Sequence, residues 1–330
     1  MGPKQTMSSN LFADPAMLTT SLQALSPFKT SLADFDSETS NNIHSVSNFT
    51  FESRVAQNPD ALVGVSLGDS WFNYLPAFFA DPFNGDLMGH LHRTGNFNIY
   101  NFGQAGDTLE NMAYGTTVQS GYQPVPCKLI EVVGSVSKYK PAFFLLSGGG
   151  NDFSGNDGIC LEAYLNHSVS SLTPLRLKRA QETFEVFNRG MIETICKAVR
   201  EAHPGIQIFL HGYDYAMPDG RPVFKAPGGF NFVGPWLLPA FARKRLMDVT
   251  IRYQAIRDVI DIYNEELAAL AGQYPDVHHI DCRGVLQQDT TDWANELHPT
   301  PAGWAKLAQK FSNVILSVVR PAPQPAAAAR

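Results

Sequence analysis

Two residue types that together perform nucleophilic catalysis stand far apart in this sequence. Ser70 follows an apolar stretch, residues 62–67, in the segment GDSWFNY. A serine hydroxyl becomes a good nucleophile when a base takes its proton, and histidine is the usual base near neutral pH. His298, one of nine histidines, lies in the segment LHPT. Taken alone, Ser70 could simply be a turn residue and His298 could simply precede a helix. Whether the two act together depends on where the surrounding elements place them.

Those elements alternate regularly along the chain. Apolar or β-branched stretches predict five strands, over residues 62–67, 96–102, 142–147, 206–211 and 277–282. Helical patterns separate them, over residues 86–93, 108–112, 128–138, 177–202, 248–272 and 301–319. This alternation predicts βαβ units and an α/β fold with a five-stranded parallel sheet covered on both faces. Ligands of such open sheets bind at the carboxyl ends of the strands.

Polar and glycine-rich turns follow four of the predicted strands. Their sequences are GDS, NFGQAGDT, SGGGNDFSG and HGYDY, which begin near residues 68, 101, 147 and 211. Acyl transfer requires hydrogen-bond donors already aimed at the oxyanion. We expect three donors here: the backbone N–H groups of Ser70 and Gly106, where glycine lets the backbone approach closely, and the side-chain amide of Asn151.

Composition excludes several other classes of protein. The chain has 330 residues, of which 44% are hydrophobic, and a net charge of −6 without a basic cluster, which argues against a nucleic-acid partner. The four cysteines are widely spaced, so we expect no metal site and no disulfide framework. GGGND lacks the Lys-Ser/Thr of a phosphate-binding loop, which disfavours a nucleotide cofactor. We expect no cofactor, no integral membrane segment and, without a signal peptide, a cytoplasmic location.

The chain divides into three parts. Residues 1–60 are polar and are interpreted as an N-terminal arm or accessory segment, and residues 61–320 as the folded domain. Within that domain, residues 212–247 form a long aromatic stretch that we interpret as a cap insertion. Residues 321–330 are of low complexity and form a flexible tail.

The motifs occur together in a recognisable order. GDSW, GQAGDT, GGND and LHP follow successive predicted elements, and in this the chain resembles the SGNH hydrolases, also called the GDSL esterase/lipase family. HGYDYAMPDGR and GPWL indicate a bacterial-type branch. The resemblance implies a flavodoxin-like three-layer α/β/α sandwich. It also implies Ser70 as nucleophile, His298 as base, and Ser70, Gly106 and Asn151 as the oxyanion hole.

The sequence departs from the family at one position. The family usually has an aspartate three residues before the histidine, whereas this chain has Asn295. Four groups are candidates for orienting the imidazole. They are the Asn295 amide oxygen, a backbone carbonyl of residues 292–294, the carboxylate of Asp292 or Glu296, and Asp214 at the end of the fourth strand.

The predicted function is hydrolysis of carboxylic esters, as an esterase or lipase, through an acyl-serine intermediate. Five aromatic residues are expected to bind the substrate, a small-molecule, lipid or carbohydrate ester: Trp71, Phe72, Tyr74, Tyr213 and Trp236. One alternative is an acyltransferase that uses the same site. Because of Asn295, a catalytically inactive binding module with this fold is a second alternative. The sequence makes no prediction of the oligomeric state.

Overall fold

A parallel sheet forms the centre of the protein. The computed structural model describes residues 51–74, 86–116, 123, 125–155, 158–225, 231–232 and 234–320. The sheet contains β1 (Leu62–Leu67), β2 (Phe97–Asn101), β3 (Phe143–Leu146), β4 (Gln207–Gly212) and β7 (Val277–Asp281). Their order is β2-β1-β3-β4-β7, and every neighbouring pair is parallel. The predicted α/β fold with five parallel strands is confirmed.

The strand sequences explain why the sheet is buried on both faces. β3 reads FFLL, and all four of its residues are buried between β1 and β4. Strands covered on both faces are continuously apolar instead of alternating. Because all five strands run in the same direction, their carboxyl ends meet at one edge of the sheet.

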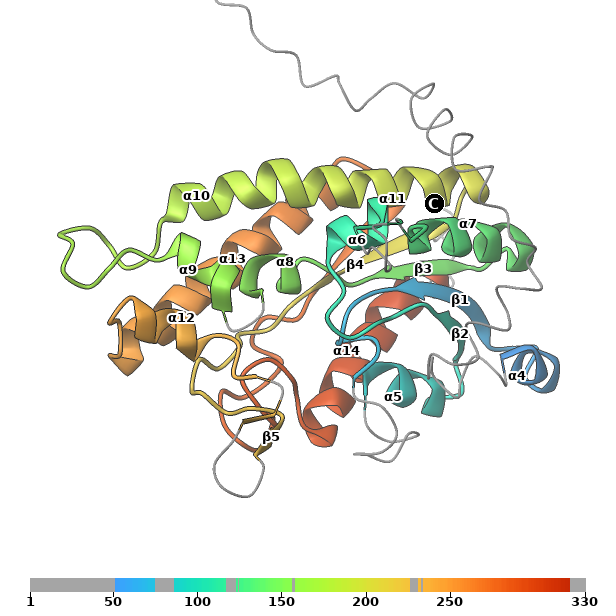
Figure 1. The fold of residues 1–330 in the computed structure, drawn as a ribbon. Coiled ribbons are helices and arrows are strands. Elements are labelled where there is room, and N and C mark those ends of the chain that lie inside the picture. The colour runs from blue at the N-terminus through green and yellow to red at the C-terminus, as the bar shows by residue number, and fades with distance from the viewer. Residues whose placement is uncertain are drawn as a thin grey trace, which may run out of the picture.

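Helices cover both faces of the sheet (Figure 1). One layer contains α6 (Leu109–Tyr114), α7 (Lys128–Tyr139), α11 (Arg189–Ala202) and α13 (Val249–Ala271). The opposite layer contains α5 (Leu87–Arg93) and α14 (Pro301–Val319), which pack against each other. Thr300 caps α14 by accepting a hydrogen bond from the Gly303 N–H, and Pro301 occupies the first helical position.

The helix predicted over residues 177–202 contains an irregular turn. It consists of α10 (Leu177–Glu182), the π-helical turn η3 (Thr183–Asn188) and α11. Within η3, Phe184 is buried against Phe153 and Tyr263, whereas Phe187 is 68% exposed. A π turn inserts a residue into the helix and occurs often at functional sites. Hydrophobic spacing does not reveal it, because the helical pattern on both sides is regular.

Several short elements were not expected from the sequence. They are α4 (Phe51–Gln57), α8 (Gly150–Ser154), α9 (Ile159–Tyr164), α12 (Leu238–Arg243) and the antiparallel pair β5 (Phe224–Lys225) and β6 (Asn231–Phe232). The pair and α12 lie within the expected cap, residues 212–247.

Helix α4 shows that the folded part of the chain begins before residue 61. Phe51 is buried, and its ring contacts Tyr100 and Tyr139 at centroid distances of 5.2 and 4.9 Å. Residues 51–60, which the sequence assigned to the arm, therefore pack on the sheet domain. Residues 1–50 and 321–330 of the expected arm and tail lie outside the described residues.

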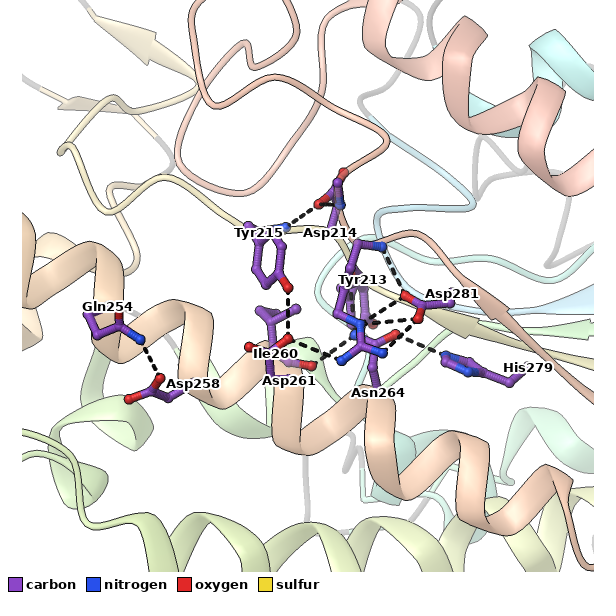
Figure 2. Close-up of polar contacts among 12 residues, drawn as sticks. Tyr213, Asp214, Tyr215, Gln254, Asp258, Ile260, Asp261, Asn264, His279 and Asp281 are labelled. Atoms are coloured by element: carbon purple, nitrogen blue, oxygen red, sulfur yellow. Dashed lines mark hydrogen bonds and ion pairs between the residues drawn. The ribbon is translucent and has the colours of Figure 1, made fainter.

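The end of β4 is fixed to α13 by hydrogen bonds (Figure 2). The Asn264 side chain donates to the Tyr213 carbonyl at 3.1 Å, and its Oδ1 lies 2.9 Å from Nε2 of His279 on β7. The Tyr215 hydroxyl donates to Asp261 at 2.8 Å. A Cβ atom at Gly212 would lie 1.9 Å from Asn264 Oδ1 and 2.4 Å from His279 Nε2. Only glycine fits between these two side chains.

Gly212→Ala is expected to destabilise the fold by about 1–3 kcal/mol, because two hydrogen-bonded side chains must move to admit one methyl group. Urea unfolding followed by circular dichroism measures this. Gly134→Ala is the control, since Gly134 is exposed on α7 and a methyl group there would have no neighbour within 4 Å beyond the helix's own backbone. That control is expected to stabilise the protein by about 0.5–1 kcal/mol. Equal stability of the two variants would contradict the packing described for Gly212.

Candidate active site

Ser70 lies in a tight turn at the carboxyl end of β1. The Asp69 carbonyl accepts hydrogen bonds from the N–H groups of Phe72 (3.1 Å) and Asn73 (3.2 Å), and the Asp69 carboxylate accepts from Trp71 (3.0 Å). The Gln104 N–H donates to the Gly68 carbonyl at 2.8 Å and ties this turn to the one after β2. The Ser70 side chain is half-buried at this edge of the sheet.

His298 lies near the end of the long connection, residues 282–300, between β7 and α14. An isolated β-bridge between Trp293 and Pro299 closes this loop just before the helix. The loop places the imidazole Nε2 2.7 Å from Ser70 Oγ. The fold thus joins two residues that are 228 positions apart in the chain.

The other imidazole nitrogen contacts Asn295. Asn295 Oδ1 lies 3.0 Å from each of three nitrogens: the backbone nitrogens of Leu297 and His298, and His298 Nδ1. Backbone N–H groups only donate, so they fix which end of the amide faces them. An oxygen at that position requires Nδ1 to carry the imidazole proton. Nε2 is then the acceptor, and Ser70 Oγ–H donates to it.

Two aromatic rings hold the imidazole from its sides. The Tyr74 ring lies 4.3 Å from the His298 ring at 31°, and its hydroxyl accepts a hydrogen bond from Asn295 Nδ2 at 2.8 Å. Trp236 contacts the same imidazole edge-on at 5.4 Å. Burial raises the pKa of Tyr74 to about 12, so its hydroxyl stays protonated. These contacts restrict the rotation of the imidazole.

Burial also determines the charge of His298. The side chain is only 4% exposed, and loss of solvation lowers the pKa of His298 to about 3. No carboxylate compensates for this, since the partner at Nδ1 is a neutral amide. The imidazole is therefore neutral near pH 7, the form that accepts a proton.

The carboxylates considered as alternative partners are bound elsewhere. Asp292 forms an ion pair with Lys306 at 2.6 Å. The Asp214 carboxylate accepts hydrogen bonds from the backbone N–H groups of Gly284 (2.8 Å) and Leu286 (2.7 Å). The backbone carbonyls of residues 292–294 are likewise not the partner of Nδ1. Of the four candidates left open by the sequence, the Asn295 amide oxygen is the one that contacts the ring.

Glu296 joins this loop to the segment that follows β4. Its buried carboxylate accepts hydrogen bonds of 2.5–2.9 Å from four backbone N–H groups, those of Gly220, Trp236, Leu237 and Leu238. Burial raises the pKa of Glu296, although these N–H groups oppose the shift. The carboxylate thus fixes Trp236 and the neighbouring part of the expected cap next to His298.

The expected oxyanion donors lie on three connected turns. Asn151 at the start of α8 donates to the Asp107 carbonyl at 2.8 Å, and the Leu109 N–H donates to Asp152 at 2.9 Å. Gly106 is exposed and has a φ of +82°, which favours glycine. Among the described residues, the N–H groups of Ser70 and Gly106 have no hydrogen-bond acceptor. Both are free to bind an external oxygen.

The five expected substrate-binding aromatics occupy different environments. Phe72 is fully buried and its ring contacts those of His211 and Phe311, so it belongs to the core and is not available to a substrate. Trp71 and Tyr213 are also buried, but they line a cavity beside Ser70. Tyr74 and Trp236 flank His298 instead.

Sequence reasoning missed a buried polar network beneath Ser70. The Tyr213 hydroxyl and the Ser147 hydroxyl both donate to the Asp69 carboxylate, the latter at 3.0 Å, and Ser147 Oγ lies 2.9 Å from His211 Nδ1. Burial raises the pKa of Asp69. These residues lie at the ends of three predicted strands, but spacing alone does not show that their side chains meet.

In the described part of the chain, no group of three or more His, Cys, Asp or Glu side chains is arranged to hold a metal ion. None of the helices described combines the length and the apolar character needed to cross a membrane.

Comparisons with solved structures give distant similarities. A family 3 carbohydrate esterase of Clostridium thermocellum is 13% identical, with 79% of this chain and 98% of that chain covered and a TM-score of 0.42. A lipase from a goat rumen metagenome is 14% identical, with coverages of 77% and 97% and a TM-score of 0.45. A family 3 carbohydrate esterase of Talaromyces cellulolyticus is 11% identical, with coverages of 79% and 100% and a TM-score of 0.41.

No curated protein matches the sequence significantly. The family model of the GDSL-like Lipase/Acylhydrolase family, in contrast, matches residues 63–306, from β1 into α14. This range contains the Ser70 turn, the turns after β2 and β3 and the His298 loop. The chain therefore belongs to the GDSL-like lipase/acylhydrolase family and is a hydrolase of the esterase type with the SGNH fold.

Proposed function

We propose that this protein is a serine esterase that hydrolyses carboxylic esters through an acyl-serine intermediate, with Ser70 as nucleophile and His298 as base. The 2.7 Å contact between Ser70 Oγ and His298 Nε2 carries the proposal. It is a productive contact because the tautomer fixed by Asn295 leaves a lone pair on Nε2. The serine proton therefore has an acceptor within transfer distance.

In the first half of the reaction, Ser70 Oγ attacks the ester carbonyl carbon while its proton moves to His298 Nε2. The carbonyl oxygen becomes an oxyanion, which accepts hydrogen bonds from the Ser70 and Gly106 N–H groups and from the Asn151 amide. The oxyanion then collapses and the bond to the alcohol oxygen breaks. The Nε2 proton passes to that oxygen, and the alcohol leaves.

The second half uses the same groups in reverse. Water attacks the acyl-serine and gives one proton to His298 Nε2. The bond between the acyl carbon and Ser70 Oγ breaks, and the proton returns to Oγ. The products are one carboxylic acid and one alcohol, and the enzyme is restored. If another hydroxyl took the place of water, the same steps would transfer the acyl group.

With Asn295 as the partner of His298, the proposed triad contains a neutral amide in place of the usual carboxylate. It keeps the ring orientation and the tautomer, which are necessary for proton transfer, but supplies a dipole where the family usually has a charge. The imidazolium formed during the reaction is therefore stabilised less. The binding-module alternative rested on the loss of the aspartate, and the retained orientation of the imidazole argues against it.

The nucleophile is tested with a fluorophosphonate probe and p-nitrophenyl acetate. Ser70→Ala is expected to abolish labelling and to lower kcat by more than about 10⁴-fold, because no other oxygen occupies the attacking position. His298→Ala is expected to lower both the labelling by the probe and kcat strongly. Thr194→Ala, at a hydroxyl on α11, is the control and is expected to keep full activity. Labelling that survives Ser70→Ala would refute the assignment.

The role of Asn295 is tested through the pH profile of kcat/KM. In the wild type, the buried neutral His298 is expected to remain unprotonated well below its ordinary pKa of about 6.5, so activity persists into acid. Asn295→Asp places a carboxylate against Nδ1 and raises the pKa of His298, which moves the acid limb to higher pH. The second oxygen of the new carboxylate can accept a hydrogen bond from the Tyr74 hydroxyl, so the side chain keeps its position.

Asn295→Ala removes the acceptor and is expected to lower kcat at least about a hundredfold. Asn313→Asp, the same change at an exposed position on α14, is the control and is expected to leave the profile unchanged. An acid limb that does not move in Asn295→Asp would contradict the contact between Asn295 and the imidazole.

A further inference from the structure

A cavity adjoins Ser70 and is lined by Leu297 of the His298 loop but not by His298 itself. Its volume is about 70 Å³, and it lies between the Ser70 turn, α8, η3, the segment after β4, α13 and Leu297. Ser70 and Asn151 are at its wall, whereas His298 is not among its lining residues. The cavity therefore begins at the proposed nucleophile and oxyanion donor and extends into the domain.

Its position identifies the part of the substrate that it would hold. In the proposed reaction, His298 gives its proton to the leaving alcohol, so the alcohol lies on the side of His298 with Tyr74 and Trp236. The acyl group stays bonded to Ser70 and must point elsewhere. The cavity opens at Ser70 and Asn151 and is not lined by His298, Tyr74 or Trp236, so it is the space available to the acyl group.

The cavity wall is mainly apolar. It includes Phe153 of α8, Phe184 of η3, Ala216 after β4, Leu237 of the expected cap, and Ile256 and Val259 of α13. Such a wall favours a hydrocarbon chain over a sugar or a charged group, because a polar group buried there would lose its hydration without replacement.

The charged and phenolic side chains at the wall are already bonded. Asp69 accepts from the Tyr213 hydroxyl, Asp214 accepts from backbone N–H groups, and the Tyr263 hydroxyl donates to the Gly148 carbonyl. The buried hydroxyl of Ser154, in contrast, has no hydrogen-bond partner among the described residues. No unpaired charge is therefore available to recognise a polar acyl group.

The π turn contributes the group that limits the size of the cavity. It directs Phe184 inward, where the ring stacks on Phe153 at 5.7 Å and contacts Tyr263 at 5.1 Å. These three rings form a continuous aromatic wall. For scale, an engineered apolar cavity of about 150 Å³ binds benzene, so a cavity half that size holds roughly three or four carbons.

We propose that this cavity is the acyl-binding site for short aliphatic acids, and that Phe184 and Ala216 determine the acyl-chain length. The proposal rests on the proposed esterase function. Esters of butanoic or pentanoic acid fit, since the roughly three or four carbons beyond the carbonyl fill the space. Acetyl leaves the cavity unfilled, and a dodecanoyl chain is too long for it.

The test measures kcat/KM of the full chain for p-nitrophenyl acetate, butanoate, pentanoate, octanoate and dodecanoate. The wild type is expected to prefer butanoate or pentanoate over acetate and dodecanoate by roughly tenfold or more. Phe184→Ala is expected to move the optimum to octanoate or beyond. Ala216→Phe is expected to move the optimum to acetate, because the acetyl group does not need the part of the cavity that the new phenyl ring fills.

Phe187→Ala is the matched control, because Phe187 lies in the same π turn but is 68% exposed. It is expected to keep the wild-type order of esters. Active-site titration with the fluorophosphonate probe corrects each variant for its folded fraction. Ser154→Ala, which replaces the unpaired hydroxyl with a methyl group, is expected to increase kcat/KM for butanoate, and a decrease would indicate a polar occupant and overturn the aliphatic assignment.

The outcomes separate this proposal from the proposed function. If no ester is turned over and the probe does not label Ser70, the esterase function fails. If the wild type is active but dodecanoate is its best substrate, or if Phe184→Ala and Ala216→Phe keep the wild-type order of esters, the acyl-site proposal fails and the esterase function stands.

Discussion

The arrangement of the site depends on one hydrogen-bonding atom, Asn295 Oδ1. It accepts from two backbone N–H groups of its own loop, and these bonds hold the loop in its turn and fix the direction of the amide. The same oxygen then determines which nitrogen of His298 carries the proton. Only in that tautomer can Nε2 accept the proton of the Ser70 hydroxyl. Loop conformation, ring orientation and proton position are thus set at a single atom.

Because the His298 imidazole is buried, its hydrogen bond to Asn295 Oδ1 matters more. His298 is almost fully enclosed by Tyr74, Trp236 and the loop itself, and its pKa is low because no charge offsets the lost solvation. In such surroundings the other tautomer would place the unprotonated Nδ1 against the Asn295 oxygen, so that two buried acceptors would face each other without a proton between them. The neutral partner also removes the need to bury a second charge. The proposed consequence is a base that stays available in acid but stabilises its protonated form less.

The parallel sheet explains how distant parts of the chain share one edge. The Ser70 turn, the Gly106 turn and the Asn151 turn follow β1, β2 and β3, and backbone and side-chain hydrogen bonds tie them to one another. The loop with His298 comes from the far end of the chain and is fixed by Glu296 to the segment after β4. Ser70 therefore has two different surroundings, the aromatic rings around His298 and an apolar cavity that His298 does not line.

The sequence by itself determined the sheet, the order of its turns and the family, because these depend on local patterns such as β3 and on short motifs such as GDSW. It also narrowed the partner of His298 to four candidates, but spacing could not choose among them: the Asn295 amide oxygen, a backbone carbonyl of residues 292–294, the carboxylate of Asp292 or Glu296, and Asp214. Only the tertiary structure decided, because the choice depends on which way the loop turns and on Lys306 and backbone N–H groups that occupy the carboxylates. Phe72 and Phe184 show the same limit: aromatic residues look alike in sequence, and packing alone placed one in the core and the other at the cavity wall.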